Sequence, residues 1–201
     1  MAYASLHHGT TAKYVFFVTE KGLVKKVPLE EYSKTKKTTG IIALTLNEGD
    51  RLAAVTFIEE EDIVLVTKMG MAIRFSSKDL TIASRIAKGM KGITLKPDDT
   101  ILTCLPIKHD TDSLAVISKT GSGRKNPLSE YPCQGRGGKG LMCYKDEIAG
   151  AALVDSTDEL LIVGDKTSIR ISAQEIPTLN RSSVGNSIIK NNNKVVSISK
   201  V

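Results

Sequence analysis

The chain has 201 residues, 41% of them hydrophobic, which is enough for one domain or two small ones with a sizeable buried core. Its 28 Lys and Arg against 22 Asp and Glu leave a net charge of +6, which is compatible with an anionic partner. No apolar run approaches the roughly 18 to 20 residues of a membrane-spanning helix, and no signal-peptide stretch opens the chain, so we expect no membrane contact and a cytoplasmic location.

Four repeats follow one another along the chain. Each begins with an apolar run and a tight turn, VFFVTEKG, IVLVTKMG, LAVISKTG and LLIVGDKT, and the turns end at Gly22, Gly70, Gly121 and Thr167. A second run follows the turn, a glycine-bearing loop leads to a third, and a fourth begins at Leu52, Ile101, Ile148 and Val195. Runs of 4 to 8 residues rich in Val, Ile, Leu and Thr are typical of strands. Four strands in each repeat predict an all-β, propeller-like array of about four four-stranded blades.

The repeat boundaries are predicted near 14–62, 63–112, 113–159 and 160–201. Residues 1–13 are expected to be the tail of a preceding blade or a leader. The three cysteines, Cys104, Cys133 and Cys143, form no CxxC pair, which suits reduced thiols. Cys104 lies within the apolar run ILTCLPI and is predicted to be in the core.

One acid recurs near the end of the second run of each repeat, at Glu31, Asp79, Glu130 and Glu175. Catalytic carboxylates are one interpretation. Recurrence in every repeat favours a structural role, in which the acid caps a strand or pairs with a nearby base.

Basic residues also keep their place in the repeat. Equivalent positions on successive blades lie along one side of the array, so these charges are predicted to form a basic track. On the second run they are Lys25, Lys26, Arg74, Arg124, Lys125 and Arg170, and in the following loops they are Lys36, Lys37, Arg85, Lys88, Lys91, Arg136, Lys139 and Arg181.

The loop QGRGGKG, residues 134–140, allows several interpretations. It fits the string GxGxxG, but a dinucleotide site needs a following helix and a parallel sheet, and a strand-like run follows here. A P-loop needs a glycine five residues before the Gly-Lys pair and Ser or Thr after it, where Cys133 and Gly140 stand. Zinc needs four ligands, and the two flanking cysteines have no paired histidines.

Binding of a phosphate backbone is the functional interpretation that remains for this loop. Glycines let a loop approach a phosphate, while Arg136 and Lys139 neutralise charge and Gln134 can donate a hydrogen bond. No aromatic residue stands among these charges, so duplex phosphates are a better target than stacked single strands. The structural alternative is an inter-strand loop whose charges keep it soluble.

The stretches VTEKGLVKKVPLEEY, ISKTGSGRKNPLSEY and QGRGGKG resemble the C-terminal domain of the A subunit of bacterial type IIA topoisomerases, DNA gyrase first and topoisomerase IV second. The resemblance runs from about Tyr14 to Val201. The loop is similar to that family's box, Gln-Arg-Arg-Gly-Gly-Lys-Gly. It matches the box at Gln134, Arg136, Gly137, Gly138, Lys139 and Gly140, whereas Gly135 stands where the box has a basic residue.

The resemblance implies a β-pinwheel in which neighbouring blades exchange a strand and a basic rim bends duplex DNA without base specificity. Gyrase has six blades, so four repeats imply a missing beginning. The implied partners are double-stranded DNA and, within a heterotetramer, the ATPase B subunit with the rest of the A subunit, in the nucleoid of a bacterial cytoplasm. No catalysis, metal or cofactor is expected of this chain, because ATP and Mg would bind other domains of the parent topoisomerase. A propeller that binds a protein or peptide is the rival interpretation.

Overall fold

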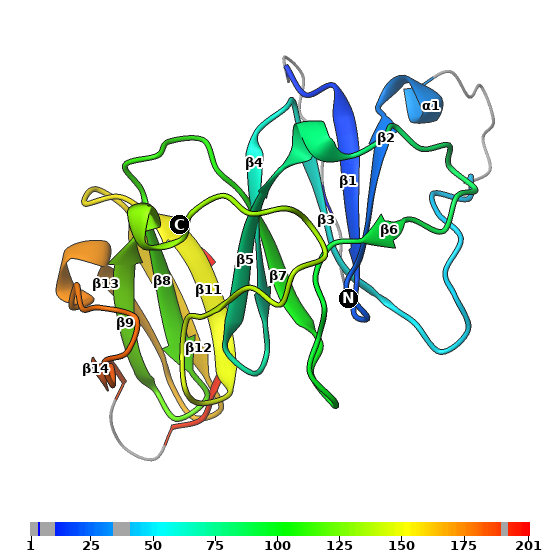
Figure 1. Ribbon diagram of the computed structural model, residues 1–201. Helices are drawn as coiled ribbons and strands as arrows, with labels where there is room; N and C mark the ends of the chain where they lie inside the picture. Colours follow the sequence, from blue (N-terminus) through cyan, green and yellow to red (C-terminus); the bar gives the residue numbers. More distant parts are fainter. Residues whose placement is uncertain (1–3, 5–10, 34–40, 190–192) are drawn as a thin grey trace.

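The computed structural model describes residues 4, 11–33, 41–189 and 193–201. These residues form short strands joined by turns, one helix and three 3-10 turns, namely α1 (Glu30–Ser33), η1 (Ser77–Asp79), η2 (Leu128–Glu130) and η3 (Ala173–Glu175). In this part of the chain the strands make four small antiparallel sheets, which follow one another across the molecule (Figure 1). No helix among these residues is long and apolar enough to cross a lipid bilayer.

Each sheet is one blade, and we number the blades one to four along the chain. From inner to outer strand, blade one contains β3 (Leu52–Ile58), β1 (Tyr14–Thr19), β2 (Leu23–Pro28) and β6 (Met90–Lys91). Blade two contains β7 (Ile101–Pro106), β4 (Asp62–Thr67), β5 (Met71–Ser76) and β10 (Leu141–Met142). Blade three contains β11 (Ile148–Val154), β8 (Ser113–Ser118), β9 (Ser122–Pro127) and β14 (Asn186–Ser187). Blade four contains β15 (Val195–Lys200), β12 (Glu159–Gly164) and β13 (Ser168–Ser172).

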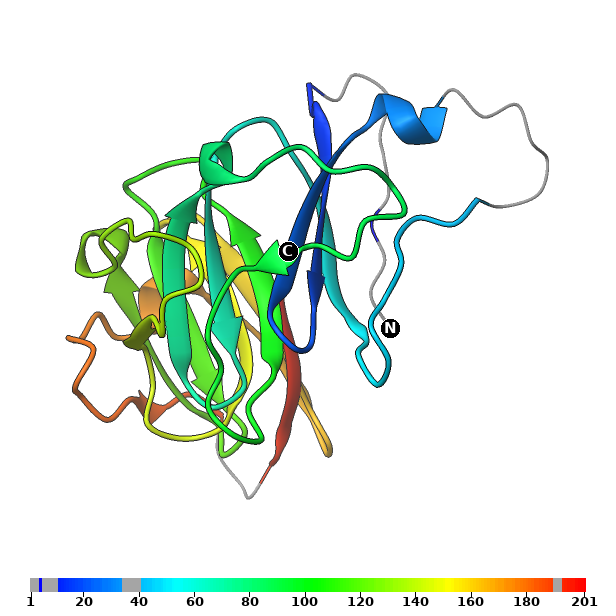
Figure 2. The same cartoon turned by 45° about the vertical axis from the view of Figure 1, so that its right-hand side comes forward.

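The predicted all-β array is confirmed, with one difference in the last blade. Blades one to three have four strands each, whereas blade four has three in the part of the chain that the structure describes. The reason lies in how the fourth strand is supplied, because β6, β10 and β14 each come from the repeat after the blade that they complete. Figure 1 shows β6 beside β2, away from the other strands of its own repeat, and in Figure 2 β6 again lies beside the blue strands of blade one.

The segments that make this exchange are ten-residue loops with equivalent positions. The first, second and third exchange loops are residues 82–91, 133–142 and 178–187. Each enters through a parallel bridge to the third strand of the preceding blade (β2, β5 or β9), at Lys26, Arg74 and Lys125 respectively. After each loop, two successive N–H groups donate to the carbonyl of a turn glycine, and for Gly70 the donors are Cys143 at 2.7 Å and Tyr144 at 3.2 Å.

Glycine is required where an exchange loop touches the preceding blade. Gly140 has φ +69°, and a Cβ there would lie 2.4 Å from the carbonyl oxygen of Ala72 on β5. Gly70, at the turn between β4 and β5, has φ +82°, and its Cβ would lie 2.0 Å from the carbonyl oxygen of Tyr144. Left-handed backbone and closeness to another backbone both exclude a side chain at these positions. The second exchange loop therefore lies flush against blade two.

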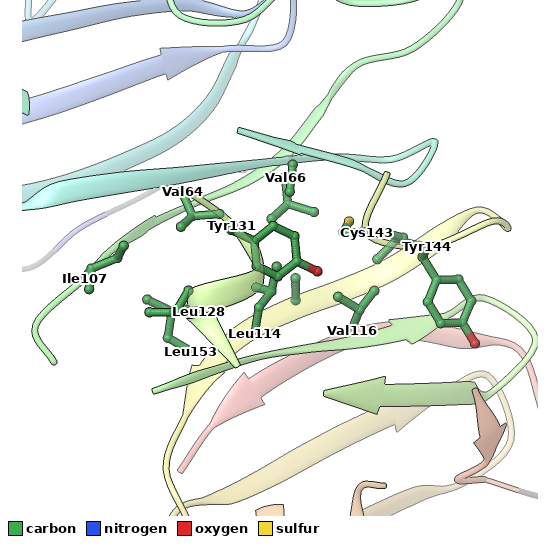
Figure 3. Packing of buried hydrophobic residues seen from close by; sticks show 13 residues of the cluster. Val64, Val66, Ile107, Leu114, Val116, Leu128, Tyr131, Cys143, Tyr144 and Leu153 are labelled. Carbon is green, nitrogen blue, oxygen red and sulfur yellow. The ribbon is translucent and has the colours of Figure 1, made fainter. Parts of the chain in front are cut away.

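The main core clusters lie between blades, because the central strands β1, β4 and β8 of blades one to three bury both of their faces. On β4, Ile63 and Leu65 join the cluster shared with blade one, while Val64 and Val66 join the cluster shared with blade three (Figure 3). Continuous apolar runs are what a strand buried on both faces requires. Cys104 is buried, as its apolar run predicts, and Cys143 is buried as well, whereas Cys133 is exposed; all three are free thiols.

Candidate nucleic-acid interface

The cations that recur on the second strand of each repeat lie at one register position. Lys26, Arg74, Lys125 and Arg170 stand opposite Phe16, Val64, Ala115 and Leu161 of the central strands. The Nζ of Lys26 donates to the carbonyl oxygen of Ser77 at 2.7 Å, and the Nζ of Lys125 donates to that of Ala173 at 2.5 Å. Ser77 and Ala173 begin η1 and η3 of the next repeats. These two lysines therefore join successive blades, and burial lowers the pKa of both.

Arg74 and Arg170 make ion pairs at the equivalent position. Arg74 bonds Asp62 through Nε at 3.0 Å and Asp110 through Nη2 at 2.7 Å, and Arg170 bonds Glu159 through Nε at 2.6 Å. Burial by itself lowers the pKa of Arg74, but the hydrogen bonds and charges of the two carboxylates outweigh it and the net shift is upward. Both guanidiniums are partly neutralised before any ligand arrives.

Two further predicted contacts, Lys25 and Arg124, are buried with exposed fractions of 2% and 0%. Both side chains bond backbone carbonyls of exchange loops. The structure does not place them on an open surface. Two others, Lys36 and Lys37, lie outside the described residues.

Each exchange loop carries an arginine at its fourth position, and the three differ in their partners. Arg85 lies 3.9 Å from a carboxylate oxygen of Glu31, and Arg181 lies 3.7 Å from one of Glu130. Both acids belong to the recurring set, so their predicted pairing with nearby bases is confirmed. Glu175 of that set closes a capping box on η3 with Ser172.

Arg136, the arginine of the second exchange loop, is exposed. Its Nη1 donates to the carbonyl oxygen of Lys91 at 3.2 Å, and no carboxylate of the described residues lies within 4.0 Å of it. An unpaired guanidinium keeps its charge available for an anion. Among the three equivalent arginines of the described loops, Arg136 is the one best placed to meet a phosphate.

The second exchange loop is anchored on the end of the first. The N–H of Gly137 donates to the carbonyl oxygen of Gly92 at 2.7 Å, and Thr94 bonds the loop through its N–H to Gly138 at 2.8 Å and its Oγ1 to Gly137 at 2.7 Å. Sequence reasoning did not find Thr94, because it belongs to another repeat and carries no motif. These bonds bring Lys91 and Arg136 side by side.

The exposed cations of the two adjoining loops form what we call the basic cluster. Its members are Lys88, Lys91, Arg136 and Lys139, all of them exposed. Gln134 is half-buried, and its N–H donates to the carbonyl oxygen of Arg74 at 2.8 Å. Gly137, Gly138 and Gly140 shape the same loop, with Gly137 at φ +82°. The cluster thus combines four cations with a glycine-rich backbone that is hydrogen-bonded to Gly92 and Thr94. No group of three His, Cys, Asp or Glu side chains that could hold a metal ion occurs in the described part of the chain.

Gly135 offers a direct test of the cluster. It is exposed, its φ lies outside the left-handed region, and a Cβ there would meet nothing within 4 Å. We expect Gly135→Arg to fold normally and to add one phosphate contact, raising duplex affinity about eightfold at 0.1 M salt and steepening the salt slope by about 0.9. Fluorescence anisotropy with a labelled duplex measures both quantities. Gly135→Gln, with no charge, should leave the slope unchanged, and an equal gain from Gln and Arg would contradict a phosphate contact.

The family model described as the DNA gyrase C-terminal domain, beta-propeller, matches residues 13–59, 61–108, 112–155 and 167–201. The DNA gyrase A subunit of Lawsonia intracellularis is 35% identical over 187 residues, which cover 89% of this chain and 23% of that protein. The chain therefore spans less than a quarter of the length of that relative.

Two solved structures share the fold. The crystal structure of the C-terminal domain of DNA topoisomerase IV superposes with a TM-score of 0.89 at 25% identity, covering 97% of this chain and 63% of that one. The structure of a DNA gyrase A C-terminal domain superposes with a TM-score of 0.84 at 24% identity, covering 95% of this chain and 66% of that one. The arrangement of blades is thus shared with both.

Proposed function

From the premise that the chain belongs to the DNA gyrase C-terminal domain family, as its repeats and glycine-rich loop predict, we propose that its basic cluster binds and bends duplex DNA through the phosphate backbone. The proposal rests on Arg136, which is exposed and has no carboxylate partner among the described residues. This arginine lies beside Lys91, on a loop that packs closely against blade two. Arginine and lysine contacts to phosphates position a protein on a duplex without reading its sequence.

Bending requires contacts on more than one blade. Bending 20 to 30 base pairs smoothly by 40 to 90° costs on the order of 1 to 6 kcal/mol, so contacts must act together to offset it. The exchange loops lie at equivalent places on blades one, two and three, which is the arrangement such a path needs. The tyrosines nearest the loops, Tyr131 and Tyr144, are buried and unavailable for base stacking.

The chain's place in a larger enzyme is part of the proposal. It would present a bent segment to the catalytic core of an ATP-dependent type IIA topoisomerase, formed by the ATPase B subunit with the rest of the A subunit. The chain by itself would be a binding domain without catalysis, in the bacterial cytoplasm at the nucleoid.

Closure of a nicked circle tests the proposal. The chain is bound to a nicked plasmid, the nick is ligated, and the topoisomers are counted after protein removal. A shift in linking number that grows with bound protein supports bending with a defined sign. A topoisomer distribution equal to that of DNA alone, at saturating protein, would overturn it.

Two alternatives have their own observations. The first is a topoisomerase IV domain, whose structure superposes with the higher TM-score of the two. A supercoiling assay with gyrase core subunits separates the two assignments, because we expect negative supercoiling only for a gyrase domain.

The second alternative, a protein-binding propeller, is favoured by Ile86 and Val184, apolar loop residues that are 74% and 69% exposed. Binding that does not respond to salt would favour that second alternative.

A further inference from the structure

Two buried cations lie beneath exchange loops at the same register position. Lys25 of β2 stands opposite Phe17, and Arg124 of β9 stands opposite Val116. Their exposed fractions are 2% and 0%. The equivalent residue of blade two is Ile73, which is also buried. A buried charge is costly unless its donors are satisfied, so the partners of these two cations are informative.

Both cations bind the same two carbonyls of the loop above them. The Nζ of Lys25 donates to the carbonyl oxygen of Arg85 at 2.5 Å and to that of Ala87 at 3.1 Å. Arg124 donates through Nη2 to the carbonyl oxygen of Arg181 and through Nε to that of Ser183 at 3.1 Å. In each case these are the fourth and sixth positions of the exchange loop.

The arginine cation is embedded more deeply than the lysine. Its Nη1 bonds the side-chain oxygen of Asn126, its Nη2 also donates to the carbonyl oxygen of Cys143 at 2.8 Å, and its Cζ lies 5.3 Å from the ring centre of Tyr144. Asn126 in turn donates to the carbonyl oxygen of Leu179 at the second loop position. The three guanidinium nitrogens of Arg124 thus all donate to acceptors of the protein itself, two of them in the exchange loop.

The second exchange loop shows what replaces the cation. Ile73 offers no donor, and its Cδ1 would lie 3.5 Å from a Cβ on Gly138. The carbonyls at the fifth and sixth positions, Gly137 and Gly138, instead accept from Thr94, which lies outside the loop. All three loops therefore have carbonyls that accept hydrogen bonds from outside the loop. The donor is a buried cation in the first and third loops and Thr94 in the second.

Resting on the proposed function, we propose that Lys25 and Arg124 are positioning residues that hold the loop carbonyls inward, so that the arginine at the fourth position is presented to DNA. A carbonyl oxygen carries partial negative charge and repels a phosphate, so a loop that approaches DNA must turn such oxygens away. The cation holds the carbonyl of the same residue, Arg85 or Arg181, whose side chain remains 33% or 32% exposed beside the carboxylate of Glu31 or Glu130. These residues act through the loop and do not touch the phosphate.

Positioning and direct contact give different salt responses. Without the buried cation, DNA must order the loop on binding, and that entropic cost does not depend on salt. We expect Lys25→Met and Arg124→Met to weaken binding of a 40-base-pair duplex about tenfold at every salt concentration, with the slope of log affinity against log salt unchanged within about 0.3. Arg136→Gln, the matched control, should lower that slope by about 0.9.

Substituting each cation by the other type should preserve duplex binding. Blade one uses lysine where blade three uses arginine, so Lys25→Arg and Arg124→Lys should retain most of the affinity. If urea unfolding shows that the Met variants do not fold, Lys25→Gln and Arg124→Gln replace them. The glutamine amide can reach one carbonyl, so we expect a loss of affinity between those of wild type and the Met variants.

Hydrogen exchange of the free protein separates this proposal from the proposed function. We expect amides of 83–89 to exchange faster in Lys25→Met, and those of 179–185 in Arg124→Met, whether or not DNA binds. Unchanged exchange, or a slope lowered by about 0.9 as for a lost phosphate contact, would overturn the positioning role. Failure of the wild-type chain to bind DNA, with faster exchange in both variants, would overturn only the proposed function.

Discussion

Replacing Arg136 and Lys139 together with glutamine is expected to weaken binding of duplex DNA up to about 60-fold at 0.1 M salt. Each phosphate contact contributes about 0.9 to the slope of log affinity against log salt, so losing two lowers the slope by about 1.8. Both residues are exposed on the second exchange loop, and Arg136 bonds only a carbonyl oxygen among the contacts of the described residues. Their removal should therefore leave the unfolding free energy within about 0.5 kcal/mol of wild type.

A charge-matched control shows whether duplex binding depends on the position of the two charges or only on the net charge. Lys96 and Lys166 are exposed lysines outside the exchange loops, and Lys96→Gln with Lys166→Gln removes the same two charges. Fluorescence anisotropy between 50 and 200 mM salt should give a slope close to wild type for this control. Equal losses of slope in the two double variants would show that binding follows net charge and that the basic cluster has no special role.

Gly70→Ala is expected to lower the unfolding free energy by about 3 kcal/mol or more. Gly70 has φ +82°, and the new Cβ would lie 2.0 Å from the carbonyl oxygen of Tyr144. The chain must then leave the left-handed region or displace the segment that donates to Gly70 from Cys143 and Tyr144. Because that segment follows β10, the change also loosens the strand that joins blade three to blade two.

Urea unfolding followed by circular dichroism measures this loss. Gly135→Ala is the matched control, since nothing lies within 4 Å of its Cβ and its backbone is not left-handed. We expect the control to be neutral or slightly stabilising, because alanine restricts the unfolded chain. A Gly70→Ala variant as stable as Gly135→Ala would mean that the exchange segment does not pack against this turn.

The repeats and the all-β fold could be predicted from the sequence because the central strands of blades one to three are buried on both faces. Runs such as IVLV carry apolar residues at every position, and the turn glycines recur at near-constant spacing. The recurring acids were also interpretable, and Glu31 and Glu130 do pair with arginines. In each case the signal is a recurrence along the repeats, although Glu31 and Glu130 find their arginines in the following repeat.

The burial of Lys25, Lys26 and Arg124 could not be predicted, because it depends on a different repeat. Lys25 bonds Arg85, and Arg124 bonds Arg181, residues that reach them only when the following repeat crosses onto the third strand of the preceding blade. Position within a repeat indicates that cations share one side of the array, but not whether a loop covers them. For the same reason Thr94, which holds the glycine-rich loop, could not be recognised.

The salt dependence of duplex binding by the wild-type chain tests phosphate-backbone binding by the basic cluster most directly. With contacts from Lys88, Lys91, Arg136 and Lys139, log affinity should fall linearly with log salt with a slope of about 3.6 or steeper, and duplexes of unrelated sequence should give the same line. A flat response, or no duplex binding at 50 mM salt, would contradict it.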